Sequence, residues 1–163
     1  MRRCLVVGGV ILAVMTGRYW LPCVVVYAPS NSMPKGWYVR AFLQRAVQVG
    51  DIVVLDAPSS VQAALPPELP RARLLKQIAG VPGEPVCWMA EGMWVWHPAN
   101  AVTYLRHPAI HVPPHPSECH VLRTEELLVV GQHPRSLDSR YIGTVDARLV
   151  QFRVWPLWTW RGK

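Results

Sequence analysis

Two side chains of this sequence, the hydroxyl of Ser32 and the amine of Lys76, are of the types that together can cleave a peptide bond without a histidine. Ser32 lies in a run rich in turn-forming residues and poor in helix formers, so its side chain is expected to be exposed. A serine acts as a nucleophile only when a base takes its proton and donors stabilise the oxyanion. The candidate donors are the backbone N–H of Ser32 and the hydroxyl of Ser30.

Lys76 is placed on an apolar face by the alternation of side chains in the expected strand 73–79. Leu74 and Ile78 share the face of Lys76, because alternate residues of a strand point to the same side. Burial without a counter-charge lowers the pKa of an amine and lets the neutral form accept a proton. A lone strand lysine more often extends to water at a sheet edge, so the interpretation of Lys76 as a base depends on its neighbours.

A third segment carries hydroxyls, a carboxylate and a guanidinium that could hold the lysine in place. Ser136, Asp138 and Arg140 lie within a few residues of one another. A pair between Asp138 and Arg140 would rigidify the loop that carries Ser136. The same pair also fits an ordinary turn, so this segment alone does not distinguish the two interpretations.

Three segments resemble, in order and spacing, the three sequence boxes of the type I signal (leader) peptidase family. They are Ser30 to Pro34, Leu75 to Glu84, and Gly131 to Gly143. The short chain, the run from Ser32 to Tyr38 and the run from His133 to Tyr141 are most similar to the TraF-type conjugative-transfer peptidases, which mature pilin precursors. The resemblance spans most of the chain beyond residue 28.

The resemblance implies a Ser/Lys dyad on a largely β fold, with Ser32 as the nucleophile and Lys76 as the general base. Ser30 would supply the second oxyanion donor, and Ser136 matches the serine that orients the lysine amine. Asp138 and Arg140 match the acidic and basic residues of the last box.

Three departures from the common leader-peptidase pattern leave the proposed dyad untouched. Gln77 follows the lysine in place of arginine, Glu84 replaces aspartate, and Gln132 and His133 replace Asp-Asn. They weaken the case for a general leader peptidase.

Composition points to the membrane surface rather than to nucleic acid. The 163 residues suffice for one domain with a core. The 17 basic and 10 acidic residues give a net charge of +7, which suits any anionic partner. No run of Lys or Arg supports a nucleic-acid partner, whereas the low charge content, eight Trp and the apolar N-terminus favour lipid.

We expect residues 1–28 to form an N-terminal apolar helix that serves as a membrane anchor. Arg2 and Arg3 precede an apolar stretch in which Arg18 is the single charge as far as Ala28. A cleaved signal peptide and a buried core segment are the alternatives. An anchor or signal would place residues 29–163, the expected catalytic domain, on the periplasmic or extracytoplasmic face of the cytoplasmic membrane.

The remainder is typical of a mainly β fold of short antiparallel strands, because Val, Ile and Trp are frequent and Gly and Pro interrupt the pattern. Strands are predicted over 37–42, 52–55, 73–79, 85–89, 93–97, 126–130 and 148–154. The pair 85–89 and 93–97 is predicted to form a hairpin. A short helix is predicted around 60–65, and a long surface loop over 98–120.

No cofactor and no metal are expected. The histidines between His97 and His120 are separated by prolines that prevent a helix from aligning them, so a solvated loop is favoured over a zinc site. Cys87 and Cys119 either form a disulfide or remain buried thiols. Trp155, Trp158 and Trp160 either dock at a membrane interface or pack within a sheet.

The sequence is therefore interpreted as a membrane-associated serine endopeptidase. Its expected substrates are exported precursor proteins, in particular pilin precursors, and its expected partners are membrane lipid and a conjugative transfer apparatus. The nearest alternative is a general type I signal peptidase. An alternative of another class is a catalytically inactive, membrane-tethered assembly factor.

Overall fold

The computed structural model describes residues 25–41, 45–63, 72–107 and 117–160. Residues 1–24 of the expected anchor lie outside these ranges, whereas Val25–Ala28 form a strand, β1. Among the described helices, none is long and apolar enough to cross a membrane.

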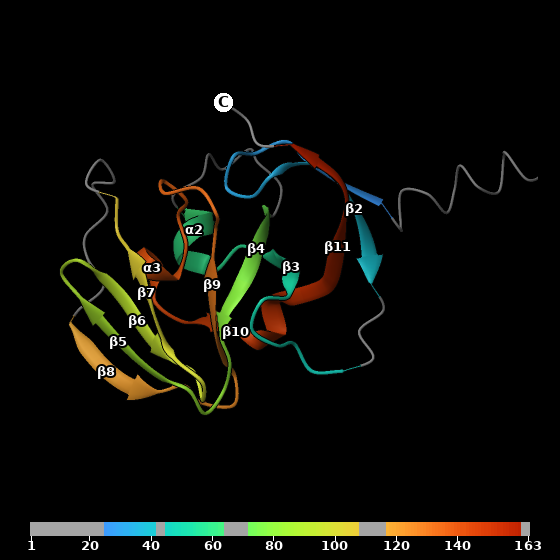
Figure 1. Cartoon of the computed structure of the whole chain (residues 1–163). Helices are drawn as coiled ribbons and strands as arrows, with labels where there is room; N and C mark the ends of the chain where they lie inside the picture. The colour runs from blue at the N-terminus through green and yellow to red at the C-terminus, as the bar shows by residue number, and fades with distance from the viewer. Residues whose placement is uncertain (1–24, 42–44, 64–71, 108–116, 161–163) are drawn as a thin grey trace, which may run out of the picture.

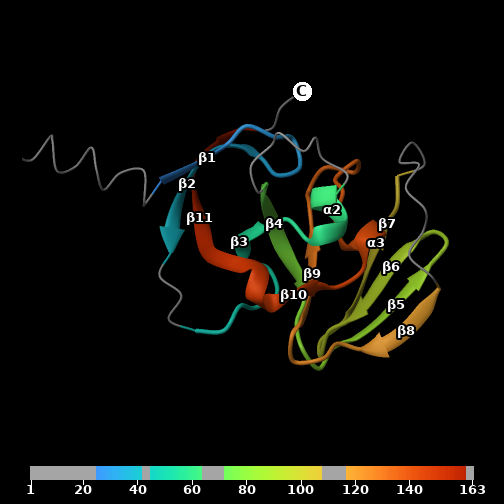
Figure 2. The same cartoon turned by 180° about the vertical axis from the view of Figure 1, so that it is seen from behind.

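Two antiparallel sheets make up the described chain (Figures 1 and 2). The larger sheet has the strand order β1-β2-β11-β3-β4-β9-β10, and the smaller sheet has the order β7-β6-β5-β8. The larger sheet contains β1, β2 (Lys35–Ala41), β3 (Ile52–Asp56), β4 (Arg73–Gly80), β9 (Glu126–Val130), β10 (Val145–Asp146) and β11 (Val150–Trp160). The smaller sheet contains β5 (Pro85–Met89), β6 (Gly92–Trp96), β7 (Ala101–Leu105) and β8 (Glu118–Val121). The prediction of a mainly β, antiparallel fold is confirmed.

Each predicted strand is present, with ends displaced by a few residues. The predicted hairpin is formed by β5 and β6. The strand predicted over 148–154 begins later and ends later, because Ala147–Leu149 form a 3₁₀ turn (η1) capped by the Asp146 side chain. The short helix predicted around 60–65 is α2 (Ser59–Ala63).

The predicted surface loop over 98–120 is wrong in part, because it contains β7 and β8. Both strands are short and lie in a Pro- and His-rich region, so their local pattern is weak. They are defined by pairing with β6 and β5, which supplies hydrogen bonds that a local sequence pattern does not reveal.

Apolar residues pack on both faces of the β4 and β9 pair. One cluster lies between the two sheets and includes Trp88, Met93 and Leu128, all buried. A second cluster on the opposite face includes Ile78 and Val53, with Leu74 packed against it. The core therefore fixes β4, the strand that carries Lys76, from both sides.

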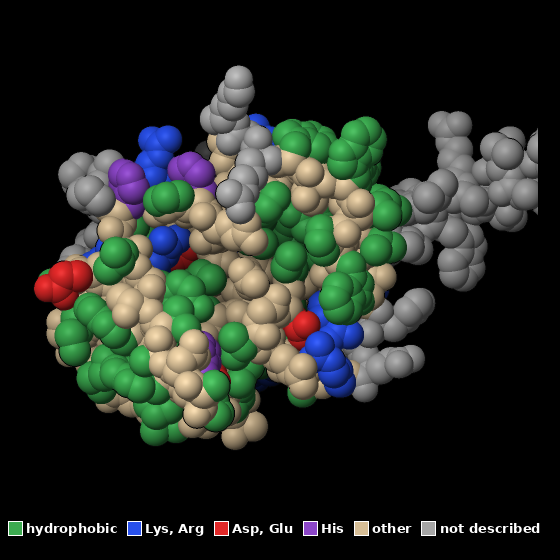
Figure 3. Space-filling model, viewed as in Figure 1, with side chains coloured by type: hydrophobic (Ala, Val, Ile, Leu, Met, Phe, Trp, Pro, Cys, Tyr) green, Lys and Arg blue, Asp and Glu red, His purple; other side chains and the backbone are tan. Residues whose placement is uncertain are grey.

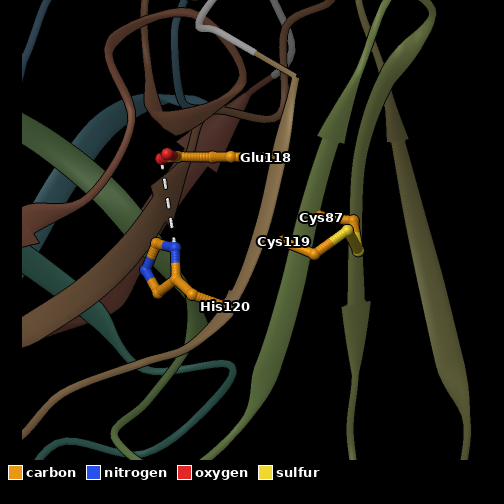
Figure 4. Close-up of a disulfide and its surroundings, with 4 residues drawn as sticks. All are labelled: Cys87, Glu118, Cys119 and His120. Atoms are coloured by element: carbon orange, nitrogen blue, oxygen red, sulfur yellow. Dashed lines mark ion pairs between the residues drawn. A yellow bond between two sulfur atoms is a disulfide. The ribbon is translucent and has the colours of Figure 1, made fainter.

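A disulfide joins Cys87 to Cys119 across β5 and β8, where the two residues are directly opposed in the register (Figure 4). The sequence left this bond undecided against free thiols. Glu118 and His120 lie on the opposite face of β8 from Cys119. The ring of His120 stacks on Trp88, and the Nδ1 of His120 lies 3.9 Å from the Glu118 carboxylate. The disulfide ties β8, one of the two edge strands of the smaller sheet, to its neighbour β5.

Candidate active site

The amine of Lys76 is buried in the centre of the larger sheet. Its residue is 3% exposed, and Nζ donates a hydrogen bond of 2.6 Å to the Oγ of Ser136. Burial lowers the pKa of Lys76 to about 8; the Asp138 carboxylate raises it and the Arg140 guanidinium lowers it. The lysine side chain therefore does not extend to water. Near neutral pH, part of the Lys76 population carries a neutral amine.

Ser32 lies in the turn between β1 and β2, where its side chain is partly exposed. The neighbouring Met33 is buried at 1% exposure, and the hydroxyl of Tyr38 donates a 2.6 Å hydrogen bond to the carbonyl of Pro34. These two contacts hold the turn against the sheet. The hydroxyls of Ser30 and Ser32 lie 3.1 Å apart.

Gly131, which follows β9, brings the serine turn and the lysine together. A Cβ on Gly131 would lie 2.1 Å from the Oγ of Ser136 and 2.7 Å from the carbonyl oxygen of Ser32. The Ser136 hydroxyl oxygen and the Ser32 carbonyl oxygen therefore both lie beside Gly131. The Ser136 hydroxyl is the one that accepts the hydrogen bond from Lys76. The backbone N–H of His133 also donates to the Ser32 carbonyl, at 3.3 Å. Only glycine leaves room for this approach.

Asp138 and Arg140 form a buried ion pair beneath the loop that carries Ser136. Asp138 is fully buried and caps the short helix α3 (Ser139–Ile142). Its carboxylate accepts from Arg140 Nη2 at 2.7 Å, from Arg140 Nε at 2.8 Å and from the N–H of Gly131 at 2.7 Å. These hydrogen bonds hold the loop that carries Ser136. They also satisfy the two buried charges, which a stable buried ion pair requires.

The Arg140 guanidinium also reaches backbone carbonyls on both sides of the site. It donates to the carbonyls of His133 and Ser136 in its own loop, and to the carbonyl of Leu105 in β7 at 3.2 Å. Arg140 therefore connects the smaller sheet to the loop beside the serine turn.

A cleft of about 820 Å³ adjoins the serine and the lysine. It is lined by the neighbours of the two residues, with Asn31 and Met33 on either side of Ser32 and Gln77 next to Lys76. The rest of the lining consists of Pro34, Thr103 to Leu105, Val130 to Pro134, and Arg140. The cleft runs from the serine turn to β7.

The structure places all six sequence-predicted residues in one region. Lys76, Ser136, Asp138 and Arg140 are linked by direct hydrogen bonds or by the ion pair, and Ser32 with Ser30 lies beside them at Gly131. Sequence reasoning missed the individual importance of Gly131 and the presence of β7 at the cleft. Within the described ranges, no group of His, Cys, Asp or Glu side chains is arranged to hold a metal ion.

The profile of the signal peptidase family, peptidase S26, matches residues 2–158 of this chain. The crystal structure of a signal peptidase I from Enterococcus faecalis V583 is similar to it, with 20% sequence identity and a TM-score of 0.41 over 67% of this chain and 97% of that one. No curated protein matches the chain significantly.

The family match defines the class of protein as a serine-type peptidase. The chain belongs to the signal peptidase family, peptidase S26. Membership of this family implies that its substrates are precursor proteins and that it associates with a membrane.

Proposed function

We propose that this protein is a membrane-associated serine endopeptidase of exported precursors, in which Ser32 is the nucleophile and Lys76 the general base. One observation carries the proposal: a buried amine with a pKa of about 8 is bonded to Ser136 beside the backbone of Ser32. At this pKa about a tenth of the lysine is neutral at pH 7, far more than for an ordinary lysine. A base of this kind suits peptide cleavage near neutral pH.

In the proposed reaction, the neutral amine of Lys76 takes the proton from the hydroxyl of Ser32 as its oxygen attacks the carbonyl carbon of the scissile bond. The oxyanion is stabilised by the backbone N–H of Ser32 and the hydroxyl of Ser30. The lysine returns the proton to the leaving amine as the C–N bond breaks, which leaves an acyl-enzyme. Water then attacks the ester and releases the second product.

The remaining residues position this pair. Ser136 orients the lysine amine through the 2.6 Å hydrogen bond, and the ion pair of Asp138 and Arg140 holds the Ser136 loop. Ser30 lies close enough to Ser32 for the two hydroxyls to share a hydrogen bond, so it can turn toward an oxyanion when substrate is present. All six predicted residues have a role in this scheme.

The proposed substrates are pilin precursors of a conjugative transfer system. The similarity of the segments 32–38 and 133–141 to conjugative-transfer peptidases supports this choice over a general leader peptidase, as do Gln77 and His133. An amine of the pilin itself could replace water in the last step and give a cyclic product. A conjugative transfer apparatus would then be the partner that receives the product.

The proposed location is the outer face of the cytoplasmic membrane, with residues 1–28 as an anchor or signal segment. Exposed aromatic side chains at the β1, β2 and β11 end of the larger sheet support docking on lipid. They are Tyr27, Trp37, Trp155, Trp158 and Trp160, which with Leu157 we call the aromatic end. Figure 3 shows hydrophobic side chains gathered over this end of the molecule.

The dyad is tested by incubating the purified protein with pilin precursors and measuring product masses. Ser32→Ala and Lys76→Ala are expected to abolish cleavage, while Ser60→Ala, which alters an exposed serine of α2, keeps the parent rate. Cleavage at the parent rate by either dyad variant would show that the assignment is wrong. A product one water lighter than the linear cut fragment identifies cyclisation.

Substrate choice is tested separately with the same protein. Pilin precursors are expected to be cleaved with a higher kcat/KM than ordinary secreted precursors. Equal rates for the two groups would favour a general signal peptidase.

A further inference from the structure

The helix α3 is too short to hold its own position. It has four residues, and a single helical turn is only marginally stable without tertiary contacts. It begins directly after Asp138 and contains Arg140, so it carries the ion pair that supports the Ser136 loop. In Figures 1 and 2, α3 lies between β9 and the smaller sheet. The position of this loop therefore depends on the contacts that fasten α3 to these neighbours.

Ser139, the first residue of α3, is fastened on two sides. It is fully buried, and in the sequence it separates Asp138 from Arg140. Its hydroxyl oxygen accepts a 2.9 Å hydrogen bond from the backbone N–H of Val129 in β9. Its carbonyl oxygen accepts a 2.7 Å hydrogen bond from the indole N–H of Trp88 in β5. One residue at the base of the site is thus bonded to both sheets.

The bond from Trp88 lies in the core. Trp88 is 2% exposed and belongs to the otherwise apolar cluster between the two sheets. A buried donor or acceptor without a partner is costly, so the indole and the Ser139 carbonyl hold each other in place. The ring of His120 stacks on Trp88 and helps to fix the orientation of the indole. Cys87 points to the opposite face of β5, so the disulfide takes no part in this contact.

We infer that Trp88 is a positioning residue of the active site, whose indole N–H fixes the start of α3 and so holds Ser136 on the Lys76 amine. The path between them is short. Trp88 bonds to Ser139, and the next residue, Arg140, donates through Nη2 to the Ser136 carbonyl at 3.4 Å. The Ser136 hydroxyl accepts the hydrogen bond from Lys76. This inference rests on the proposed function, in which Lys76 is the base.

Loss of the indole donor changes the pKa of Lys76 in a defined direction. Burial is the main reason that this pKa is low. When the start of α3 is released, the Ser136 loop moves from the amine and admits water, so the pKa of Lys76 rises. Removal of the Asp138 carboxylate has the opposite effect, because that carboxylate raises the pKa of Lys76. A rise in the pKa of Lys76 is therefore specific to a loosened loop.

The test removes the indole N–H and keeps the ring. Replacement of Trp88 by benzothienylalanine, in which sulfur takes the place of the N–H group, leaves the shape of the side chain nearly unchanged. Trp88→Phe is the simpler genetic version and also leaves the Ser139 carbonyl without its donor. Met93→Val is the matched control, because Met93 opposes Trp88 in the β5–β6 register and lies in the same buried cluster but has no hydrogen-bond donor in its side chain.

The first measurement is the titration of the Lys76 amine by carbon NMR of full-length, lysine-labelled protein in detergent. The chain has three lysines, Lys35, Lys76 and Lys163, and Lys76→Met identifies the signal of Lys76. The parent and Met93→Val are expected to titrate near pH 8, and both Trp88 variants at a higher pH. An unchanged titration in the benzothienylalanine protein, or an equal rise in Met93→Val, would overturn the inference.

The second measurement is cleavage of a synthetic precursor peptide in detergent at pH 7. In both Trp88 variants kcat is expected to fall about tenfold and KM to change less than about twofold, because a displaced base slows the chemical step and Trp88 does not line the cleft. A raised KM with an unchanged kcat would contradict a positioning role. The titration does not require catalysis, so cleavage by Lys76→Ala would refute the proposed function without affecting that measurement.

Discussion

Burial of the Lys76 amine makes the fold less stable near neutral pH. Its folded-state pKa of about 8 lies below the ordinary lysine value of 10.5, so the unfolded chain binds more protons between these two values. Stability therefore rises with pH across this window, and the full cost of about 3 kcal/mol applies below it. This sign is opposite to that of a lysine that gains a partner on folding.

Lys76→Met tests this sign. The parent protein is expected to gain Tm between about pH 8 and pH 10 relative to Lys76→Met, and the variant is expected to be at least as stable as the parent at pH 7. Thermal unfolding across this pH range measures the difference. A difference in Tm that does not change with pH would contradict the depressed pKa.

The same pKa is expected to govern the pH dependence of activity. Because the neutral amine is the proposed base, kcat/KM is expected to rise with pH to a plateau with an apparent pKa near 8. Lys76→Met is expected to lose about a hundredfold or more. A pH profile that is flat from pH 6 to pH 9 would require another base.

Gly131 controls the distance between the serine turn and the lysine. In Gly131→Ala the new methyl would lie 2.1 Å from Ser136 Oγ and 2.7 Å from the Ser32 carbonyl, so one of them must move. We expect kcat to fall at least about a hundredfold, since small displacements of reacting groups are costly. Cleavage kinetics and circular dichroism together separate this loss from unfolding.

Gly80→Ala is the matched control. The nearest atoms to a methyl there are side-chain carbons of Leu128 and Leu122, the closest at 2.7 Å, so it should lower stability without changing kcat. Equal losses of kcat in both glycine variants would mean that Gly131 acts through general stability.

At the scale of elements, the loop 131–138 and α3 act as one support for the lysine. Asp138→Asn removes the charge that pairs with buried Arg140, which we expect to cost about 3 kcal/mol. Burial lowers the pKa of Lys76 and the Asp138 carboxylate raises it, so loss of that carboxylate should lower the pKa further. The pH profile of any residual activity is expected to move to lower pH, which a purely structural role of Asp138 would not cause.

The disulfide stabilises the smaller sheet without reaching the lysine. Cys87 and Cys119 are 32 residues apart, so replacing both with serine is expected to cost roughly 3–4 kcal/mol through the entropy of the unfolded chain. Denaturant unfolding measures this loss. Acylation of Ser32 by a small ester is expected to be unchanged at low temperature, because Lys76 and Ser136 belong to the other sheet and its loops; a large loss would link the two sheets more tightly than proposed.

For the whole molecule, the aromatic end and the apolar N-terminal segment would place the cleft near lipid. Trp158 is 72% exposed and Trp155 is 53% exposed, and both lie on β11. In the double variant Trp155→Ser and Trp158→Ser, cleavage of a precursor embedded in anionic vesicles is expected to fall severalfold, whereas cleavage of the same precursor in detergent stays unchanged.

Trp96→Ser is the control for this prediction, because Trp96 is an exposed tryptophan of the smaller sheet. Equal rates on vesicles for the parent and the double variant would argue against docking through the aromatic end.

The sequence by itself determined the two-residue alternation, and with it the buried face of Lys76, the hairpin of β5 and β6 and the mainly β class. It also placed Ser32 in a turn, because proline and glycine set the backbone there. The resemblance to the three sequence boxes of the family predicted Ser136, Asp138 and Arg140 as further residues of the site.

Only the tertiary structure decided which segments meet. The strand β7 is defined by pairing with its neighbour β6 and β8 by pairing with the more distant β5, and the Cys87–Cys119 bond follows from the register of β5 and β8. The approach of Ser32 to Ser136 at Gly131 depends on two segments far apart in sequence, the serine turn and the loop that begins at Gly131. Contacts of this kind are set by packing and long-range pairing, which local propensity does not encode.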